Sequence, residues 1–268
     1  MVFILKIFKA GKYELELSKK TYIMGILNVT PDSFSDGGMW NNTDKAVKRA
    51  IEMVAQGADI IDVGGQSTRP GHTIITAEEE LDRIYDVVKI LTDELDVPIS
   101  VDTYYSDVAK EVLSLGVSII NDVKGFEKEM LKVAFESNCG CIVMHSNQGK
   151  DIKQFFERKK TEALDFGIES KRLCFDPGIG FSKLYEENLS ILNNFDKICI
   201  DDCAMMIAAS RKRCIGTPCG DPEFKDRDAG TIAAHTIAIS KGADIIRVHN
   251  IDKAVQAAKV TDAIIRGR

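Results

Sequence analysis

The chain has 268 residues, of which 44% are hydrophobic and 28% charged, with a formal net charge of -6. This negative balance argues against non-specific nucleic-acid binding, which requires a basic surface. No segment approaches the roughly 18–20 apolar residues of a membrane helix, so we expect neither a signal peptide nor a membrane partner. The seven cysteines are irregularly spaced, which favours free thiols in a reducing cytoplasm over zinc or disulfide bonds.

Residues 1–18 alternate apolar and polar side chains around Ala10-Gly11-Lys12, which predicts a β-hairpin. Eight short apolar runs then follow, each ending in polar residues. Such continuous runs are typical of parallel strands that helices cover. The predicted strands are Tyr22–Leu27, Asp59–Val63, Ile99–Val101, Ser118–Ile120, Cys141–Met144, Leu173–Phe175, Met206–Ala209 and Ile245–Val248.

The segments between these runs carry helical signals. Residues 47–54 and 81–95 have apolar stripes at helical spacing, and Thr76 with Glu79 resembles a capping box. Glycine, which tolerates a left-handed backbone, stands at three expected helix-to-strand joints. These are Gly57, Gly116 and Gly242. The words GADIIDV (57–63) and GADIIRV (242–248) are nearly the same, which suggests equivalent joints.

This alternation predicts an α/β fold, a (β/α)8 TIM barrel with an N-terminal hairpin, in one domain spanning residues 1–268. An open, doubly wound sheet remains an alternative on pattern alone. In a closed barrel the functional groups lie at the carboxyl ends of the strands. Those ends are polar in every unit, whereas a single strand-end Asp or Asn is more often a turn or helix cap. We therefore expect a binding site there.

The polar groups differ around the predicted ring. Asp102, Asn121 and Asp176 offer acceptors and one amide, which suit a neutral heterocycle with adjacent N–H donors. The other group consists mainly of donors and comes from the last two units, the usual phosphate corner of this barrel. Its members are Lys212, Arg247 and His249, with Arg69 as a further candidate cation. The competing interpretation of each cation alone is a solvated surface charge.

Loop 30–38 (TPDSFSDGG) is rich in turn formers and is a candidate lid, although alone it would be read as a capped turn. The lid would carry Asp36 over the site. His72 and His235 are expected to cap or pack rather than catalyse. The G-x-G at 178–180 lacks a dinucleotide-binding context.

Several sequence motifs, taken in chain order, resemble those of the dihydropteroate synthase family over essentially the whole chain after the hairpin. They are GILNVTPDSFSDGG (25–38), GADIIDVGGQSTRPG (57–71), ISVDT (99–103), INDV (120–123), VMH (143–145), DPGIGFSK (176–183), SRK (210–212) and IRVHN (246–250).

The resemblance implies a barrel enzyme, usually a homodimer, that joins a pterin diphosphate to p-aminobenzoate. It implies that Asn28 helps to bind the Mg²⁺ cofactor. It also implies that four residues are catalytic: Asp36, Lys212, Arg247 and His249. It implies that pterin diphosphate is bound by Thr68, Asp102, Asn121, Asp176, Lys212, Arg247 and His249. It implies that p-aminobenzoate, and sulfonamide drugs in its place, is bound by Phe34, Arg69, Pro70, Phe181 and Lys212.

The sequence departs from the commonest family pattern at a few places. Gln66 stands where Glu is frequent, Arg213 where Ser is frequent and Asn250 where Asp is frequent, and loop 145–151 is unusual. None of these changes removes a residue assigned above. Two rival functions are a methyltetrahydrofolate-type methyltransferase, which needs no diphosphate corner, and a non-catalytic pterin-binding homologue. The motifs SRK (210–212) and RVH (247–249), together with the intact set of hydrogen-bond donors, disfavour both rival functions.

Overall fold

The computed structural model describes residues 6–30, 39–66, 73–147 and 151–267. Eight parallel strands form a closed barrel in the order β10-β3-β4-β5-β6-β7-β8-β9, which confirms the predicted (β/α)8 architecture. Its strands are β3 (Tyr22–Asn28), β4 (Ile60–Gly64), β5 (Ile99–Asp102), β6 (Ile119–Asp122), β7 (Gly140–Met144), β8 (Leu173–Asp176), β9 (Ala204–Ile207) and β10 (Ile245–Val248).

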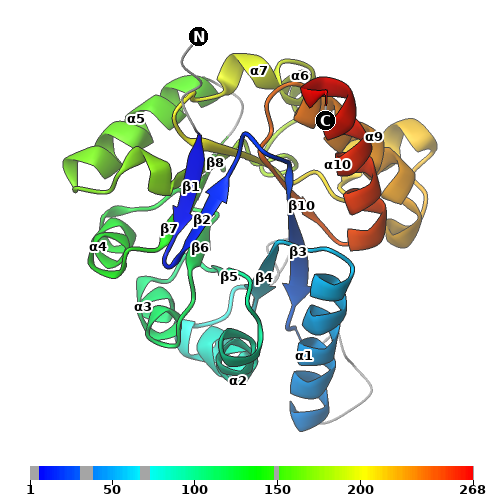
Figure 1. Ribbon diagram of the computed structural model, residues 1–268. Helices are drawn as coiled ribbons and strands as arrows, with labels where there is room; N and C mark the ends of the chain where they lie inside the picture. Colours follow the sequence, from blue (N-terminus) through cyan, green and yellow to red (C-terminus); the bar gives the residue numbers. More distant parts are fainter. Residues whose placement is uncertain (1–5, 31–38, 67–72, 148–150, 268) are drawn as a thin grey trace.

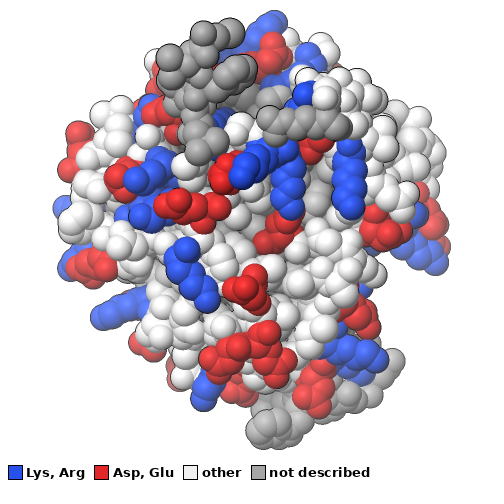
Figure 2. Space-filling model, viewed as in Figure 1, with Lys and Arg blue, Asp and Glu red and all other residues white. Residues whose placement is uncertain are grey.

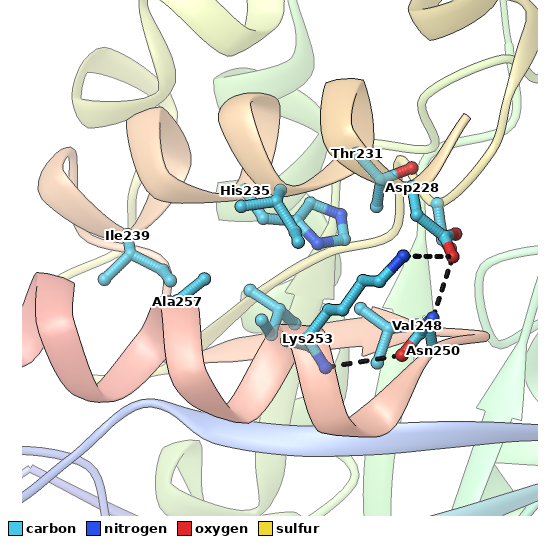
Figure 3. A pocket seen from close by; sticks show the side chains of 12 residues that line it. Asp228, Thr231, His235, Ile239, Val248, Asn250, Lys253 and Ala257 are labelled. Atoms are coloured by element: carbon cyan, nitrogen blue, oxygen red, sulfur yellow. Dashed lines mark hydrogen bonds and ion pairs between the residues drawn. The ribbon is translucent and has the colours of Figure 1, made fainter. Parts of the chain in front are cut away.

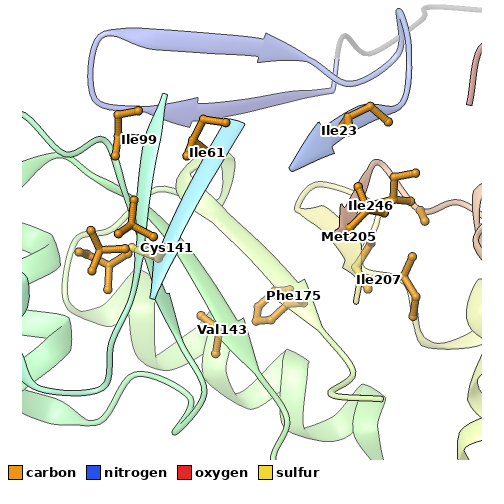
Figure 4. Packing of buried hydrophobic residues seen from close by; sticks show 14 of the residues in the cluster. Ile23, Ile61, Ile99, Cys141, Val143, Phe175, Met205, Ile207 and Ile246 are labelled. Carbon is orange, nitrogen blue, oxygen red and sulfur yellow. The ribbon is translucent and has the colours of Figure 1, made fainter. Parts of the chain in front are cut away.

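Helices surround the barrel on its outer side (Figure 1). The principal ones are α1 (Met39–Ala55), α2 (Ala77–Glu94), α3 (Ser106–Ser114), α4 (Lys128–Ser137), α5 (Ile152–Asp165), α6 (Tyr185–Asn193), α9 (Asp228–Ser240) and α10 (Ile251–Arg266). Two short helices, α7 (Phe195–Ile198) and α8 (Arg213–Gly216), flank β9 in the sequence. Outward-facing strand residues such as Ile61, Phe175 and Ile246 pack beneath these helices (Figure 4).

The predicted local signals are present. Thr76 and Glu79 form a capping box at the start of α2, because each side chain accepts a hydrogen bond from the other's backbone N–H. The three joint glycines all have φ between 101° and 104°, a region that favours glycine. The prediction for β9 was two residues late, since the strand is Ala204–Ile207 rather than Met206–Ala209. Ala208 and Ala209 are buried beyond the strand end, so the apolar run outlasts the strand.

The hairpin of β1 (Ile7–Ala10) and β2 (Tyr13–Glu16) closes the amino-terminal end of the barrel (Figure 1). Phe8 and Leu15 of the hairpin, with Leu17 directly after it, join the inward-facing residues at the base of the strands in one apolar cluster. Each buried side chain of this size stabilises the fold by about 1.5–3 kcal/mol. With this end filled by apolar side chains, polar groups inside the barrel are confined to the opposite end.

Candidate active site

The barrel interior changes from apolar to polar along single strands, because alternate strand residues face the same side. The lower inward positions belong to the apolar cluster: Ile60, Ile119, Cys174 and Ile245. Two residues further along the same four strands stand Asp62, Asn121, Asp176 and Arg247. The polar residues that the sequence places near strand ends therefore gather inside the carboxyl-terminal mouth of the barrel.

Asp62 lies at the centre of this polar group and is fully buried. Its carboxylate accepts hydrogen bonds from Ser100 Oγ at 2.6 Å, Asn121 Nδ2 at 3.2 Å and Arg247 Nε at 2.6 Å. A buried carboxylate is tolerated only when its lone pairs are satisfied in this way. Asp62 thus fixes one amide and one guanidinium that the sequence assigned to substrate binding.

Asp102 shares the same guanidinium, because Arg247 Nη2 donates to its carboxylate at 3.0 Å. Burial raises the pKa of Asp102 to about 7, Arg247 opposes this shift, and the nearby Asp62 adds to it. Near neutral pH this carboxyl therefore changes between a proton donor and an acceptor. Such a group can recognise adjacent N–H donors of a heterocycle in its ionised form.

Lys212 and Asp176 form the other side of the mouth. Lys212 Nζ donates to the carbonyl oxygen of Ile179 at 2.5 Å and lies 4.7 Å from the centre of the Phe181 ring. Burial lowers the pKa of Lys212 to about 8, and the charge of Asp176 opposes the decrease. Asp176 accepts from the backbone N–H of Gly178 at 2.8 Å. Lys212 therefore lies beside the acidic Asp176 and the aromatic Phe181, and its assignment to both organic substrates stays a prediction.

Asn28 and His249 lie at another part of the rim, where they line an open groove of about 440 Å³ together with Arg49 and Arg211. His249 Nδ1 lies 2.9 Å from the hydroxyl oxygen of Ser210, which also accepts the His249 backbone N–H at 3.2 Å. These contacts hold the imidazole next to the groove. A groove with cationic and amide side chains is suited to an anion.

His235 is part of the packing between α9 and α10, as predicted from the sequence (Figure 3). Its Nε2 accepts the backbone N–H of Ala209 at 3.2 Å, and burial lowers its pKa to about 3. The adjacent cavity of about 10 Å³ holds at most about one water molecule, so it is no substrate pocket. Nearby, Asn250 and Arg211 both donate to the carboxylate of Asp228.

Five predicted site residues lie outside the described residues, namely Phe34, Asp36, Thr68, Arg69 and Pro70. His72 lies outside them as well. The roles assigned to these residues, including the lid, stay predictions.

Sequence reasoning missed Asp62 and Ser210 as site residues. Asp62 did carry a signal: it is a charged residue within an apolar strand, and such a residue requires buried partners. Ser210 was recognised only as part of the polar strand end SRK (210–212), because its contact with His249 depends on the tertiary structure. The departure at Gln66 also has a structural role, since its side chain donates to Tyr104 Oη and accepts the Ile75 backbone N–H.

Together, the closed barrel and its polar mouth define a (β/α)8 enzyme site for a polar heterocycle and an anion. The family described as "Pterin binding enzyme" matches residues 24–249, so the chain belongs to this pterin-binding family.

A dihydropteroate synthase from Clostridium beijerinckii is 42% identical to the chain, over 96% of this chain and 99% of that protein. The structure of a dihydropteroate synthase from Clostridium difficile in the presence of pteroic acid has a TM-score of 0.90 and 45% identity, covering 94% and 99% of the two chains. The enzyme from Xanthomonas albilineans with 4-aminobenzoic acid has a TM-score of 0.91 and 33% identity, covering 97% and 98%.

Proposed function

We propose that the chain is a dihydropteroate synthase, a transferase that condenses a (7,8-dihydropterin-6-yl)methyl diphosphate with p-aminobenzoate to give 7,8-dihydropteroate and pyrophosphate in folate biosynthesis. The observation that carries this proposal is the buried network of Asp62, Asp102, Asn121 and Arg247 beside Lys212. It offers paired carboxylates and an amide to a flat heterocycle, with cations close by. The solved structures named above were obtained with pteroic acid and with 4-aminobenzoic acid, which supports a pterin and p-aminobenzoate as the two organic groups that are joined.

The pterin would lie in the mouth of the barrel, where Asp102, Asn121 and Asp176 meet its N–H and carbonyl groups. The C–O bond between the pterin methylene and the diphosphate breaks, and its electron pair leaves with the diphosphate. The amine lone pair then forms the C–N bond, and the nitrogen loses a proton to solvent. An electron-rich pterin can share positive charge at its methylene carbon, which favours a dissociative, SN1-like step.

Arylamines are neutral at ordinary pH, so the nucleophile needs no strong base. The demanding task is to stabilise the departing diphosphate, and this is where cationic side chains act. Arg247 and His249 would contact this group, and Lys212 would face both the pterin and the amine. Asp36 in the lid is proposed to stabilise the developing cation. Sulfonamides are expected to compete with p-aminobenzoate near Phe181.

The proposed Mg²⁺ fits the available donors. Among the described residues there is no cluster of three or more His, Cys, Asp or Glu side chains that could hold a metal. Mg²⁺ often takes only one or two protein oxygens and obtains the rest from phosphates and water. The Asn28 amide at the end of β3, on the groove that His249 lines, can provide such an oxygen. When bound, the ion would neutralise charge on the diphosphate.

The role of Asn28 can be tested by titrating Mg²⁺ into the wild-type enzyme and the Asn28→Ala variant. Loss of one oxygen ligand should raise the Mg²⁺ concentration for half-maximal rate by about tenfold. Gln56→Ala, which changes another amide on the same groove, is the matched control and should leave the requirement unchanged. An unaltered metal dependence in Asn28→Ala would remove Asn28 from the metal site.

The reaction itself is tested by measuring pyrophosphate release with the pterin diphosphate alone, p-aminobenzoate alone and both together. Release that requires both substrates supports the proposal. A methyltransferase or a non-catalytic homologue would release none. Lys212→Ala and Arg247→Ala should each lower kcat/KM at least about tenfold, since each removes a cation from the reacting site. Near-normal turnover in both variants would refute the site assignment.

A homodimer is proposed as the functional form. The neighbouring helices α9 and α10 expose apolar side chains, with Ile237 47%, Val260 61% and Ile264 77% accessible. Val260 and Ile264 lie one turn apart on α10. Adjoining exposed apolar residues are typical of protein interfaces, and the proposed occupant is a second copy of this chain. Val260→Glu with Ile264→Glu should yield monomers in sedimentation experiments. A wild-type chain that sediments as a monomer at micromolar concentration would contradict the dimer.

A cytoplasmic location is also proposed, supported by seven cysteines that are all free. Among the described residues, no helix is both long enough and apolar enough to span a membrane. We propose no nucleic-acid partner, because the chain has a formal net charge of -6, and the face in Figure 2 intersperses Lys and Arg with Asp and Glu.

A further inference from the structure

The loop between β8 and α6 has an unusual backbone. Three alternate residues, Gly178, Gly180 and Ser182, have φ values of 67°, 79° and 49°. The left-handed region suits glycine, but it is unfavourable for Ser182. A loop of this shape keeps a single conformation only when its surroundings hold it.

Lys183 holds the inner side of this loop. Its Nζ donates to three carbonyl oxygens, those of His145 at 2.8 Å, Gly178 at 3.1 Å and Phe181 at 3.3 Å. An ammonium group has three N–H donors, so these contacts use all of them within the protein. Burial lowers the pKa of Lys183 to about 8, while the charges of Asp176 and Glu187 oppose the decrease. Lys183 therefore forms its hydrogen bonds within the protein and not with solvent.

A second side chain holds the outer part of the loop. Buried Asn188 on α6 accepts the backbone N–H of Gly180 at 2.6 Å and donates to the carbonyl oxygens of Lys183 and Leu184. Between these two anchors lies Phe181, which is half-buried and faces the ammonium of Lys212.

We propose that Lys183 is a positioning residue that sets the specificity of the p-aminobenzoate pocket. This inference rests on the proposed function, because Phe181 is assigned to the aminobenzoate. Lys183 binds the Phe181 carbonyl directly and fixes the Gly178 carbonyl, which also accepts the Phe181 backbone N–H. Phe181 and the Ile179 carbonyl are thereby held against Lys212. Among the residues assigned to the pterin, Asp102, Asn121 and Arg247 lie on other strands. Asp176 and Lys212 contact this loop but are anchored on β8 and after β9, so the pterin pocket depends less on Lys183.

The first test compares Lys183→Met, which removes the charge at similar length, with the wild-type enzyme. The KM for p-aminobenzoate should rise about tenfold, because the aromatic wall loses its fixed position. The KM for the pterin diphosphate should change less than about twofold. Lys171→Met, which removes a lysine in an exposed ion pair with Glu169, is the control and should match the wild type. Equal changes in both KM values, or none, would overturn the proposal.

Lys183→Arg provides a milder variant if Lys183→Met does not fold. It keeps the charge, but a planar guanidinium cannot direct donors to three converging carbonyl oxygens as an ammonium does. The same selective rise in KM is expected at smaller magnitude. An Arg variant with wild-type KM values would show that charge alone suffices and would overturn the positioning role.

Equilibrium binding separates this proposal from the proposed function. Calorimetry with 6-hydroxymethylpterin reports the pterin pocket, and 7,8-dihydropteroate spans both pockets. Lys183→Met should weaken dihydropteroate binding about tenfold and change the pterin affinity less than about twofold. Equal weakening of both ligands would refute the role of Lys183, whereas a wild-type chain that binds them without turnover would refute only the proposed reaction.

Discussion

The segments 57–63 (GADIIDV) and 242–248 (GADIIRV) have the same sequence apart from one residue and fold in the same way. Each begins with a glycine at a helix-to-strand joint, with φ of 104° for Gly57 and 102° for Gly242. Each then forms a barrel strand, β4 and β10, on either side of β3.

The shared Asp in the two segments has the same structural task. Asp59 accepts the backbone N–H of Ile23 on neighbouring β3 at 3.0 Å and pairs with Lys20. Asp244 accepts the backbone N–H of Met205 on neighbouring β9 at 2.9 Å and pairs with Lys6. Both carboxylates therefore fix the start of one strand against the next.

The single difference lies at the site. Asp62 and Arg247 occupy the same position in their segments, face the barrel interior and pair with each other across β3 at 2.6 Å. The two similar segments thus form the same joint and the same strand. At the one position where they differ, Asp62 and Arg247 carry opposite charges and form a buried ion pair. The joint and the strand therefore depend on the local sequence, whereas the ion pair forms only because the barrel closes.

Breaking the pair should have the largest effect. Arg247→Ala leaves the buried carboxylates of Asp62 and Asp102 without their cation, which should destabilise the fold by about 3–5 kcal/mol. Urea unfolding would measure this loss. Arg158→Ala, which removes an exposed pair with Glu162 on α5, is the control and should cost about 1 kcal/mol or less. Similar losses in the two variants would show that the buried pair stabilises the fold no more than the control pair does.

Exchanging the charges sharpens the comparison. In Asp62→Arg with Arg247→Asp, the cation moves from β10 to β4, so part of the stability lost in the single variants should return. The catalytic rate should stay at least about tenfold below that of the wild type, because the guanidinium no longer lies on the strand next to His249. Full recovery of turnover would mean that only the presence of the pair matters.

Asp62→Asn should alter the pH dependence of pterin binding. The carboxyl of Asp102 has a pKa of about 7, and the charge of Asp62 helps to raise it. Binding that needs the ionised form should strengthen as pH rises through about 7. Without the Asp62 charge, the midpoint should move to lower pH. Pterin affinity measured from pH 5 to 9 tests this, and a midpoint that stays fixed or rises would contradict it.

The raised pKa of the Asp102 carboxyl should also make the stability of the fold depend on pH. The folded pKa lies above the ordinary value of 3.8, so the folded state retains a proton that the unfolded chain has lost. The contribution of Asp102 to stability should therefore decrease as pH rises from about 4 to about 7. Asp102→Asn should flatten the measured unfolding free energy over that interval. A slope as steep as that of the wild type would assign the effect to other groups.

The smallest losses of stability should come from substituting the Asp that the two segments share. Asp59→Ala and Asp244→Ala each remove an acceptor from a strand N–H and should destabilise the protein by about 1–3 kcal/mol. Asp244 should cost more, because its side chain is 10% exposed and that of Asp59 is 19% exposed. Chemical denaturation of both variants would rank them, and the reverse order would contradict this account.

The sequence alone determined the barrel and much of its mouth. Apolar runs ending in polar residues predicted all eight barrel strands to within two residues at each end, because helix, strand and joint signals are local. It also placed Asp102, Asn121, Asp176, Lys212 and Arg247 at strand ends, and the structure brings them into one cavity mouth. The family resemblance, based on ordered words, is confirmed.

Tertiary structure decided which of these groups contact one another. Arg247 was predicted at the diphosphate, yet the fold also gives it two carboxylates, one of them from the unassigned Asp62. Lys183 was part of a recognised word, but only the converging carbonyl oxygens of His145, Gly178 and Phe181 reveal what it does. Sequence spacing fixes the face on which a side chain lies. The partner across the barrel depends on strand order and closure, which no local pattern encodes.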